Sequence, residues 1–266
     1  MDLPKLNQSD FPDWKSYYFN YQKTLAQAYY IPLLKQNGIS IVSDSKVLDV
    51  GCGDGGFLSA FSEISKICNG IEIRNFGWEE GYNPKIIVGD ITSEQIKKSL
   101  FPKYDLLILR DVIEHISLQK KLNFMKSIYN YMDENSKLLV TFPPFYSPFG
   151  LHQQAILRMP IQIIPYLGWL PKILIKLLLR LSNQMNNWDD IEEIKDSRMT
   201  ILGFKNLITE CGLEICFEER YLVRPSHEIR YGVKTRKLDW LQIPILEEFF
   251  VSGCTFILKK IKKACK

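Results

Sequence analysis

Histidine is scarce in this sequence of 266 residues, which has three histidines and six cysteines. No two cysteines form a C-x-x-C pair, so the chain lacks the ligand spacing of a zinc site, and we predict no metal centre. Cysteines without a pairing pattern are typical of reduced thiols, and the N-terminus lacks the basic start and apolar core of a signal peptide. The sequence therefore predicts a cytoplasmic protein.

Long uncharged apolar runs are also missing from the most hydrophobic segment, residues 155–181. Its longest uncharged run has 13 residues and contains three prolines, whereas a membrane-spanning helix needs roughly 20 apolar residues. The net charge of +4 is too small to indicate a nucleic-acid partner, and we expect none. The length suits one α/β domain with an insertion.

The most informative segment is a glycine-rich turn that follows an apolar run. Residues 46–50 are typical of a buried strand, and Gly51, Gly53 and Gly55 predict a tight turn into a helix. Glycine has no Cβ, so backbone N–H groups in such a turn can approach a ligand closely. The spacing Gly51-x-Gly53-x-x-Gly56 also fits the dinucleotide-binding fingerprint, which leaves a nicotinamide-dependent oxidoreductase as an alternative.

Carboxylates at the ends of the predicted strands help to distinguish a dinucleotide from a cationic ligand. Asp49 and Asp54 flank the start of the turn, where they would repel a pyrophosphate and attract a cationic ligand. Glu72 ends the second strand, where it can accept both ribose hydroxyls of an adenosine-type ligand. Asp90 follows the third strand, and nicotinamide enzymes have no general need for an acid there. Because open α/β sheets bind ligands at the C-terminal ends of their strands, these residues favour one shared site.

In this order, the segments resemble class I S-adenosylmethionine-dependent methyltransferases of the small-molecule branch, similar to quinone-biosynthesis methyltransferases. Residues 47–57 resemble motif I of that family, and residues 104–115 resemble motif IV. The resemblance implies S-adenosylmethionine as the cofactor, with Asp90 accepting from the adenine amino group and Ile91 packing on the ring. The cofactor-binding residues that it implies are Asp49, Gly51, Cys52, Gly53, Gly55, Glu72, Asp90, Ile91, Arg110 and Asp111.

Strand-like and helix-like segments alternate along most of the chain, which predicts a parallel, doubly wound α/β sheet. The predicted strands are residues 46–50, 68–73, 85–89, 104–110, 136–142, 213–222 and 250–258, and the predicted helices are 56–66, 93–100, 117–132 and 200–211. With the resemblance, we expect a Rossmann-like sheet of seven strands, mostly parallel with an antiparallel last strand. One departure from the family is the link from Ile73 to Lys85, where two glycines and a proline leave no room for a full helix.

These patterns divide the chain into three parts, one of them discontinuous. The parts are an N-terminal helical cap (1–40), a class I methyltransferase domain (41–145 and 199–262) and a helical insertion after the fifth strand (146–198). In the insertion, Lys172, Lys176 and Arg180 recur every four residues among leucines and isoleucines, which predicts a basic amphipathic helix. We expect these three residues to face outward. Residues 155–181 would then form a lid or a peripheral membrane contact.

The acceptor chemistry is predicted from few residues. Methyl transfer requires alignment of acceptor, methyl and sulfur, and sometimes a base that removes an acceptor proton. His115 follows the fourth strand and His152 the fifth, so both are candidate catalytic bases. Residues 141–144, Thr-Phe-Pro-Pro, differ from the Asn-Pro-Pro-Tyr signature of base and amide N-methylation. This difference weakens the case for a nucleic-acid substrate. With the candidate bases, we predict O-methylation of a small molecule or of a lipid-linked or glycan precursor, and a non-catalytic nucleotide-binding protein is left as a further alternative.

Overall fold

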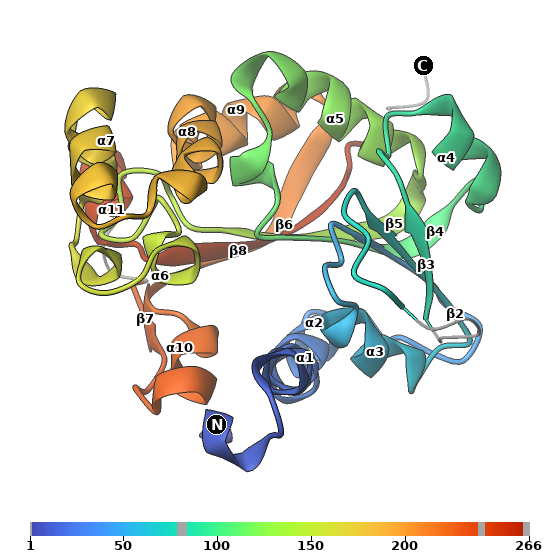
Figure 1. Cartoon of the computed structure of the whole chain (residues 1–266). Coiled ribbons are helices and arrows are strands. Elements are labelled where there is room, and N and C mark those ends of the chain that lie inside the picture. Colours follow the sequence, from blue (N-terminus) through green and yellow to red (C-terminus); the bar gives the residue numbers. More distant parts are fainter. Residues whose placement is uncertain (1, 79–83, 239–242, 263–266) are drawn as a thin grey trace.

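An eight-stranded sheet lies at the centre of the computed structural model, which describes residues 2–78, 84–238 and 243–262. The strands lie in the order β3-β2-β1-β4-β5-β8-β6-β7 (Figure 1). Their bounds are Lys46–Val50 (β1), Ile67–Glu72 (β2), Lys85–Val88 (β3), Tyr104–Arg110 (β4), Met132–Phe142 (β5), Leu213–Val223 (β6), Arg236–Lys237 (β7) and Gly253–Lys260 (β8). Strands β1 to β5 are parallel, and β8 runs antiparallel between β5 and β6. The predicted Rossmann-like, mostly parallel sheet with an antiparallel last strand is confirmed.

The sheet differs from the prediction at its β7 edge. Strand β7 is an additional strand of two residues, too short to produce the alternating pattern by which strands are recognised. The last predicted strand also begins later than expected, because Pro244–Phe250 form helix α11. A proline is tolerated in the first turn of a helix, and a short apolar run does not distinguish a helix from a strand.

Helices cover both faces of the sheet (Figure 1). Their bounds are Trp14–Leu25 (α1), Ile31–Gln36 (α2), Gly56–Ser62 (α3), Glu94–Ser99 (α4), Leu118–Asn130 (α5), Ile201–Glu210 (α9) and Pro225–Tyr231 (α10). Helices α1, α2, α3 and α10 share one apolar core with the sheet, and α4, α5 and α9 share the other. In β4, Leu106 and Ile108 belong to the first core, while Leu107 and Leu109 belong to the second. This alternation explains why residues 106–109 of the strand are all apolar.

The insertion after β5 has an apolar core of its own. Its helices are Gln153–Ile156 (α6), Lys172–Leu181 (α7) and Trp188–Ser197 (α8), and its buried residues include Leu151, Leu157, Ile161, Leu167, Ile175, Leu179, Ile191 and Ile194. Between α6 and α7 the chain forms only short 3₁₀ turns, as its prolines predict. The Phe145 N–H donates to the Met199 C=O at 2.8 Å, so the two ends of the insertion meet beside the end of β5.

The basic residues of α7 do not all face outward, which corrects our expectation. Lys172 Nζ lies 2.9 Å from Glu192 Oε1 on α8. Lys176 Nζ lies 4.3 Å from the ring centre of Trp188, also on α8. Arg180 is exposed, as expected. The expectation failed because α8 offers carboxylates and an aromatic face to the lysines, and a helical period does not reveal which neighbour a helix will have.

Candidate functional site

The glycine turn lies at the switch point of the sheet, where β1 and β4 are neighbours and their connections leave in opposite directions. Its backbone is left-handed, with φ of +76° at Gly51, +56° at Gly53 and +85° at Gly55. The Gly51 N–H donates to the Ile71 C=O at 2.8 Å, which ties the turn to β2. A Cβ added at Gly53 would meet no atom within 4 Å, so this part of the turn faces open space that a ligand can enter.

Glu72, at the end of β2, faces the same turn. Its Oε2 accepts from the Gly53 N–H at 2.9 Å, and its Oε1 accepts from the Arg74 N–H at 3.1 Å. Cys52 lies beneath the turn, where its buried Sγ would be 2.6 Å from a Cβ added to Gly70. Glu72 therefore lines the site with its carboxylate, whereas Cys52 can contribute only its backbone.

Asp49 is buried in β1 just before the turn, with 2% of its surface exposed. Burial raises the pKa of its carboxyl group to about 7; Glu72 adds to the rise and Arg110 opposes it. A carboxyl group with such a pKa responds strongly to a nearby cation, because the cation favours the ionised form. This part of the site therefore suits a positively charged ligand group.

Asp90 and Ile91 follow β3 at the same edge of the sheet. The Gly89 N–H donates to the Glu72 C=O at 2.9 Å, so the ends of β2 and β3 are adjacent. Asp90 is exposed, and its Oδ1 accepts from the N–H and the Oγ1–H of Thr92, both at 2.8 Å. Ile91 is buried. The structure places Asp90 just after β3, beside the end of β2 that carries Glu72, and the roles of Asp90 and Ile91 toward an adenine stay predictions.

The short link between β2 and β3 runs beside the glycine turn. Residues 73–78 and 84, which are the described part of this link, form no helix, as predicted. The Trp78 Nε1–H donates to the Asp54 C=O at 3.0 Å, and the ring centres of Phe76 and Trp78 lie 5.7 Å apart. Two aromatic side chains therefore flank the turn where a longer link would place a helix.

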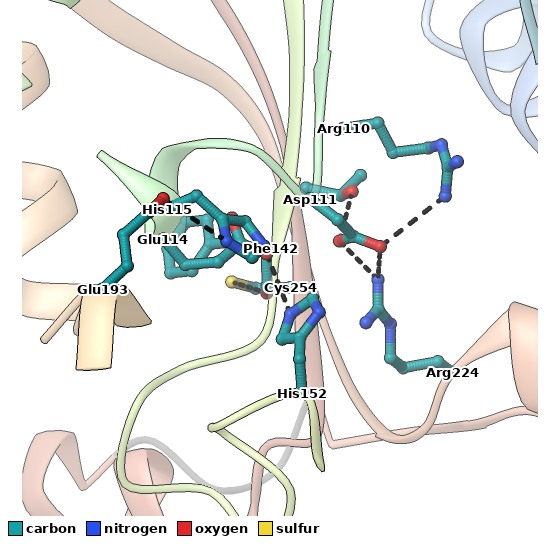
Figure 2. A network of polar contacts seen from close by, with 10 residues as sticks. Arg110, Asp111, Glu114, His115, Phe142, His152, Glu193, Arg224 and Cys254 are labelled. Atoms are coloured by element: carbon teal, nitrogen blue, oxygen red, sulfur yellow. Dashed lines mark hydrogen bonds and ion pairs between the residues drawn. The ribbon is translucent and has the colours of Figure 1, made fainter. Parts of the chain in front are cut away.

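Asp111, directly after β4, is the centre of an ion-pair network (Figure 2). Arg224 Nη2 lies 2.6 Å and 2.7 Å from its two carboxylate oxygens, and Arg110 Nη1 lies 3.6 Å from Oδ2. Burial alone would raise the pKa of Asp111, but Arg224 and Arg110 outweigh it and hold that pKa well below its usual range. The backbone of Asp111 has φ of +55°, which is uncommon outside glycine and typical of functional sites.

Arg110 extends from β4 toward the N-terminal helices. Its Nη2 donates to Gln22 Oε1 on α1, and its guanidinium lies 4.8 Å from the ring centre of Phe57 on α3. It also lowers the pKa of Asp49. Among the described contacts, its link to the predicted cofactor site is therefore electrostatic.

A second polar cluster contains both predicted catalytic bases (Figure 2). His152 Nε2 lies 2.9 Å from Glu114 Oε1, and the rings of His115 and His152 lie 5.4 Å apart at 78°. His115 Nδ1 lies 3.7 Å from Glu193 Oε1 on α8. Burial lowers the pKa of His115, which favours its neutral form. The structure thus brings the two histidines together, although they follow different strands.

A tight loop after β5 positions His152. A Cβ added at Gly150 would lie 2.2 Å from the Phe145 carbonyl oxygen, so only glycine fits there. The His152 N–H donates to the Phe149 C=O at 3.0 Å, and φ of His152 is +54°. This left-handed residue directs the imidazole toward Glu114 (Figure 2).

Glu114 is the least expected member of the cluster. It is 1% exposed, and within the described ranges its carboxylate oxygens accept no hydrogen bond: His152 Nε2 lies 2.9 Å from Oε1, but without the geometry of a hydrogen bond. A buried carboxylate without a donor is costly and indicates a missing partner such as a substrate group or an ion. The ligand atoms of Glu114, His115 and His152 all lie within 4.8 Å of one another. Nitrogen and oxygen donors of this kind suit Zn²⁺ and related divalent ions, so the three residues could hold a metal that the sequence did not predict.

Two further residues of these networks, Arg224 and Glu114, were not predicted from the sequence, for different reasons. Arg224 follows β6, 113 positions after Asp111, and no local pattern joins residues so far apart. Glu114 precedes His115 within the segment that resembles motif IV, so its position was a usable signal. A carboxylate beside a candidate base is a frequent orienting residue.

The switch-point turn, the carboxylates at the strand ends and the sheet order together define a Rossmann-like domain with an adenosine-type cofactor site. A family model described as "Methyltransferase domain" matches residues 21–214, and the chain belongs to this family. It is an S-adenosylmethionine-dependent methyltransferase, and S-adenosylmethionine is its cofactor. This replaces the nicotinamide-dependent and non-catalytic alternatives.

Solved structures share the fold at low sequence identity. An S-adenosylmethionine-dependent methyltransferase from Archaeoglobus fulgidus is 16% identical, with a TM-score of 0.51 and coverage of 92% of this chain and 100% of its own. One from Clostridium acetobutylicum is 13% identical, with a TM-score of 0.53 and coverage of 91% and 92%. The plantazolicin methyltransferase BamL is 10% identical, with a TM-score of 0.54 and coverage of 92% and 86%. A search of curated protein sequences found no match.

Proposed function

We propose that this methyltransferase methylates a hydroxyl oxygen of a small-molecule or lipid-linked acceptor, with His152 as the general base. The observation that carries the proposal is the 2.9 Å contact of His152 Nε2 with the buried Glu114 carboxylate. A hydroxyl group is a weak nucleophile until a base removes its proton, so such a contact suits oxygen acceptors. The described cysteines are free thiols, which supports the cytoplasmic setting that we propose for the enzyme.

The carboxylates at the strand ends would hold the cofactor, which supplies an electrophilic methyl group on a sulfonium. Glu72 would accept from the ribose hydroxyls, and Asp90 would accept from the adenine amino group through Oδ2. The ionised Asp49 carboxylate would attract the positively charged part of S-adenosylmethionine. Backbone N–H groups near Gly53 can approach closely, because nothing occupies the space where a Cβ would lie.

Glu114 would orient the base and stabilise it after proton transfer. Its contact with Nε2 leaves Nδ1 of His152 to meet the acceptor hydroxyl. When the imidazole takes the proton, the nearby carboxylate stabilises the resulting imidazolium. His115, at right angles to His152, would border the same space.

Separate reactions with different acceptor classes test this proposal. The protein is incubated with S-adenosylmethionine and with phenols, sugar alcohols, carboxylic acids or primary amines, and S-adenosylhomocysteine and methylated product are measured by mass spectrometry. We expect turnover with hydroxyl-bearing acceptors. Turnover confined to amines would contradict an oxygen acceptor while leaving the enzyme class unchanged.

Replacing Glu72 with glutamine should weaken the binding of S-adenosylmethionine. Loss of a hydrogen bond to a charged group costs about 1.5–3 kcal/mol, which raises the Kd roughly 10- to 150-fold. Isothermal titration calorimetry measures this, and Glu63→Gln is the control, because Glu63 pairs with Lys23 on the surface. Unchanged affinity in a folded Glu72→Gln protein would refute the assignment of Glu72 to the cofactor.

The affinity for S-adenosylmethionine should rise with pH up to about pH 7 and then level off. The free carboxyl group of Asp49 has a pKa of about 7, and a cationic ligand favours its ionised form, so binding below that pH releases a proton. Titrations between about pH 6 and pH 8 in two buffers of different ionisation enthalpy measure both effects. Asp49→Asn should bind more weakly at every pH and lose the pH dependence. A dependence that persists in this variant would assign it to another group.

A further inference from the structure

The outward face of α7 is apolar. Ile173 is 75% exposed and Leu181 is 78% exposed, and Leu174 and Leu177 beside them are exposed as well. The opposite side of the helix packs into the core of the insertion through Ile175 and Leu179, and Lys172 and Lys176 contact α8. A helix on the surface of a soluble domain normally presents its polar side to water, whereas α7 is apolar both toward the core of the insertion and toward the outside.

Further exposed apolar side chains adjoin this helix. Trp169, three residues before the first residue of α7, is 51% exposed, and its ring centre lies 5.1 Å from that of Phe249 on α11. Leu246 and Phe250 of α11 are also exposed. Figure 1 shows α7 and α11 at the same end of the molecule. We call the exposed residues of α7 together with Trp169 the α7 face; its apolar surface continues onto α11.

The sequence from the middle of β5 to the start of α8 carries charge of one sign, and the acids begin on α8, where Glu192 and Asp196 pair with Lys172. Residues 135–188 contain no aspartate or glutamate, although the whole chain has 30 of them, and they carry five lysines and arginines. Arg158 and Arg180, which belong to this segment, are exposed. An exposed apolar helix face with an exposed arginine, Arg180, on the same helix matches the boundary between the head groups and acyl chains of an anionic bilayer.

We propose that the α7 face docks the protein on the surface of an anionic lipid bilayer. None of the described helices is long and apolar enough to cross a membrane, so the contact is peripheral. A second copy of the chain is a poorer occupant, because a symmetric interface would bring two positively charged segments together. The inference does not depend on the acceptor that we propose above.

A cavity beside the α7 face fits the same orientation. It has a volume of about 390 Å³ and is lined by Tyr146, Trp169, Arg198 and Phe249 among others. Lys195, on its wall, donates to the C=O groups of Gly168 and Leu170 at 2.7 Å, which fixes the turn that presents Trp169. A molecule with an apolar part and an anionic group could therefore pass from the bilayer into this cavity.

Co-sedimentation with vesicles tests the proposal on the full chain. We expect binding to phosphatidylcholine vesicles that contain phosphatidylglycerol at low salt, weaker binding at high salt, and little binding to pure phosphatidylcholine. The Ile173→Asp and Leu177→Asp variants should each reduce vesicle binding roughly tenfold or more, because a charge replaces an exposed apolar side chain that the bilayer would bury. Leu202→Asp, at an exposed leucine of α9, is the matched control and should bind as the unchanged protein does.

Two further measurements test whether each variant is folded and whether the protein self-associates. Binding of S-adenosylmethionine by each variant verifies that it is folded, so loss of vesicle binding alone supports the α7 face. Sedimentation velocity at several protein concentrations detects self-association. Absence of binding to anionic vesicles at low salt overturns the proposal, and so does a dimer that Leu177→Asp dissociates while vesicle binding is absent.

Discussion

Replacing His152 with alanine should slow methyl transfer to a hydroxyl acceptor about 10²- to 10⁴-fold, the usual contribution of a general base. The imidazole contacts Glu114 through Nε2 at 2.9 Å and would take the acceptor proton through Nδ1. Single-turnover measurements with a hydroxyl acceptor identified as above separate this step from product release. Added imidazole should restore part of the rate in His152→Ala, since the substitution leaves space of the right shape.

Several comparisons isolate the role of the base. Glu114→Gln should reduce the rate less than His152→Ala does, because Glu114 positions the base and does not touch the acceptor. His227→Gln is the control: His227 lies on α10 beside Tyr231, and burial lowers its pKa to about 4. A rate within tenfold of the unchanged protein in a folded His152→Ala variant would mean that alignment alone drives the reaction.

Treatment with a chelator distinguishes general-base catalysis by His152 from metal binding by the same cluster of residues. If Glu114, His115 and His152 act without an ion, prolonged treatment with EDTA should leave the rate unchanged. A loss that Zn²⁺ or Mn²⁺ reverses would instead assign these three residues to a metal, for which their donor atoms are close enough. Only the second result would supply the partner that the buried Glu114 carboxylate lacks.

The central sheet could be predicted because each buried strand leaves a local pattern. Strands β1 and β4 occupy the predicted residues, 46–50 and 104–110, because apolar runs end there in glycine or charged residues. The glycine turn could be predicted as well, because the left-handed backbone at Gly51 and Gly53 favours a residue without Cβ. The candidate cofactor residues follow from the same rule, because they stand at the ends of predicted strands.

The remaining features depend on contacts between distant segments. Periodicity predicts that α7 is amphipathic, but the choice between solvent and α8 for its lysines depends on acids that follow later in the chain. The pairing of Arg224 with Asp111 joins the ends of β6 and β4. Neither contact can be predicted from a local sequence pattern. The sequence therefore predicts which residues stand at the site more readily than which of them touch.

Replacing Asp111 with asparagine should destabilise the protein by about 2–4 kcal/mol. Removing one member of a fully buried ion pair costs roughly 3–5 kcal/mol, and the side chains of Asp111 and Arg224 keep 21% and 14% of their exposure, which reduces the loss. Asparagine tolerates the left-handed backbone of Asp111, so the change removes the charge with little added strain. Urea denaturation followed by circular dichroism measures the free energy of unfolding.

The pH dependence gives the sign of this contribution. Arg224 and Arg110 hold the pKa of Asp111 below its unfolded value of 3.8, so the ion pair stabilises the fold above about pH 4 and that stability is lost as pH falls. The difference in unfolding free energy between the unchanged protein and Asp111→Asn should therefore shrink in acid. Asp2→Asn, which breaks a pair with Lys234 that is 82% and 74% exposed, should cost less than about 1 kcal/mol.

A double substitution shows whether the loss of stability in Asp111→Asn comes from leaving the charge of Arg224 unpaired. Arg224→Gln combined with Asp111→Asn removes both charges of the closest pair, and it should be less destabilising than the sum of the single changes. Additive losses would mean that the two side chains stabilise the fold independently, despite their 2.6 Å contact. Because Asp111 directly follows β4, a coupled loss would also show that the ion pair between the ends of β4 and β6 contributes to stability as one unit.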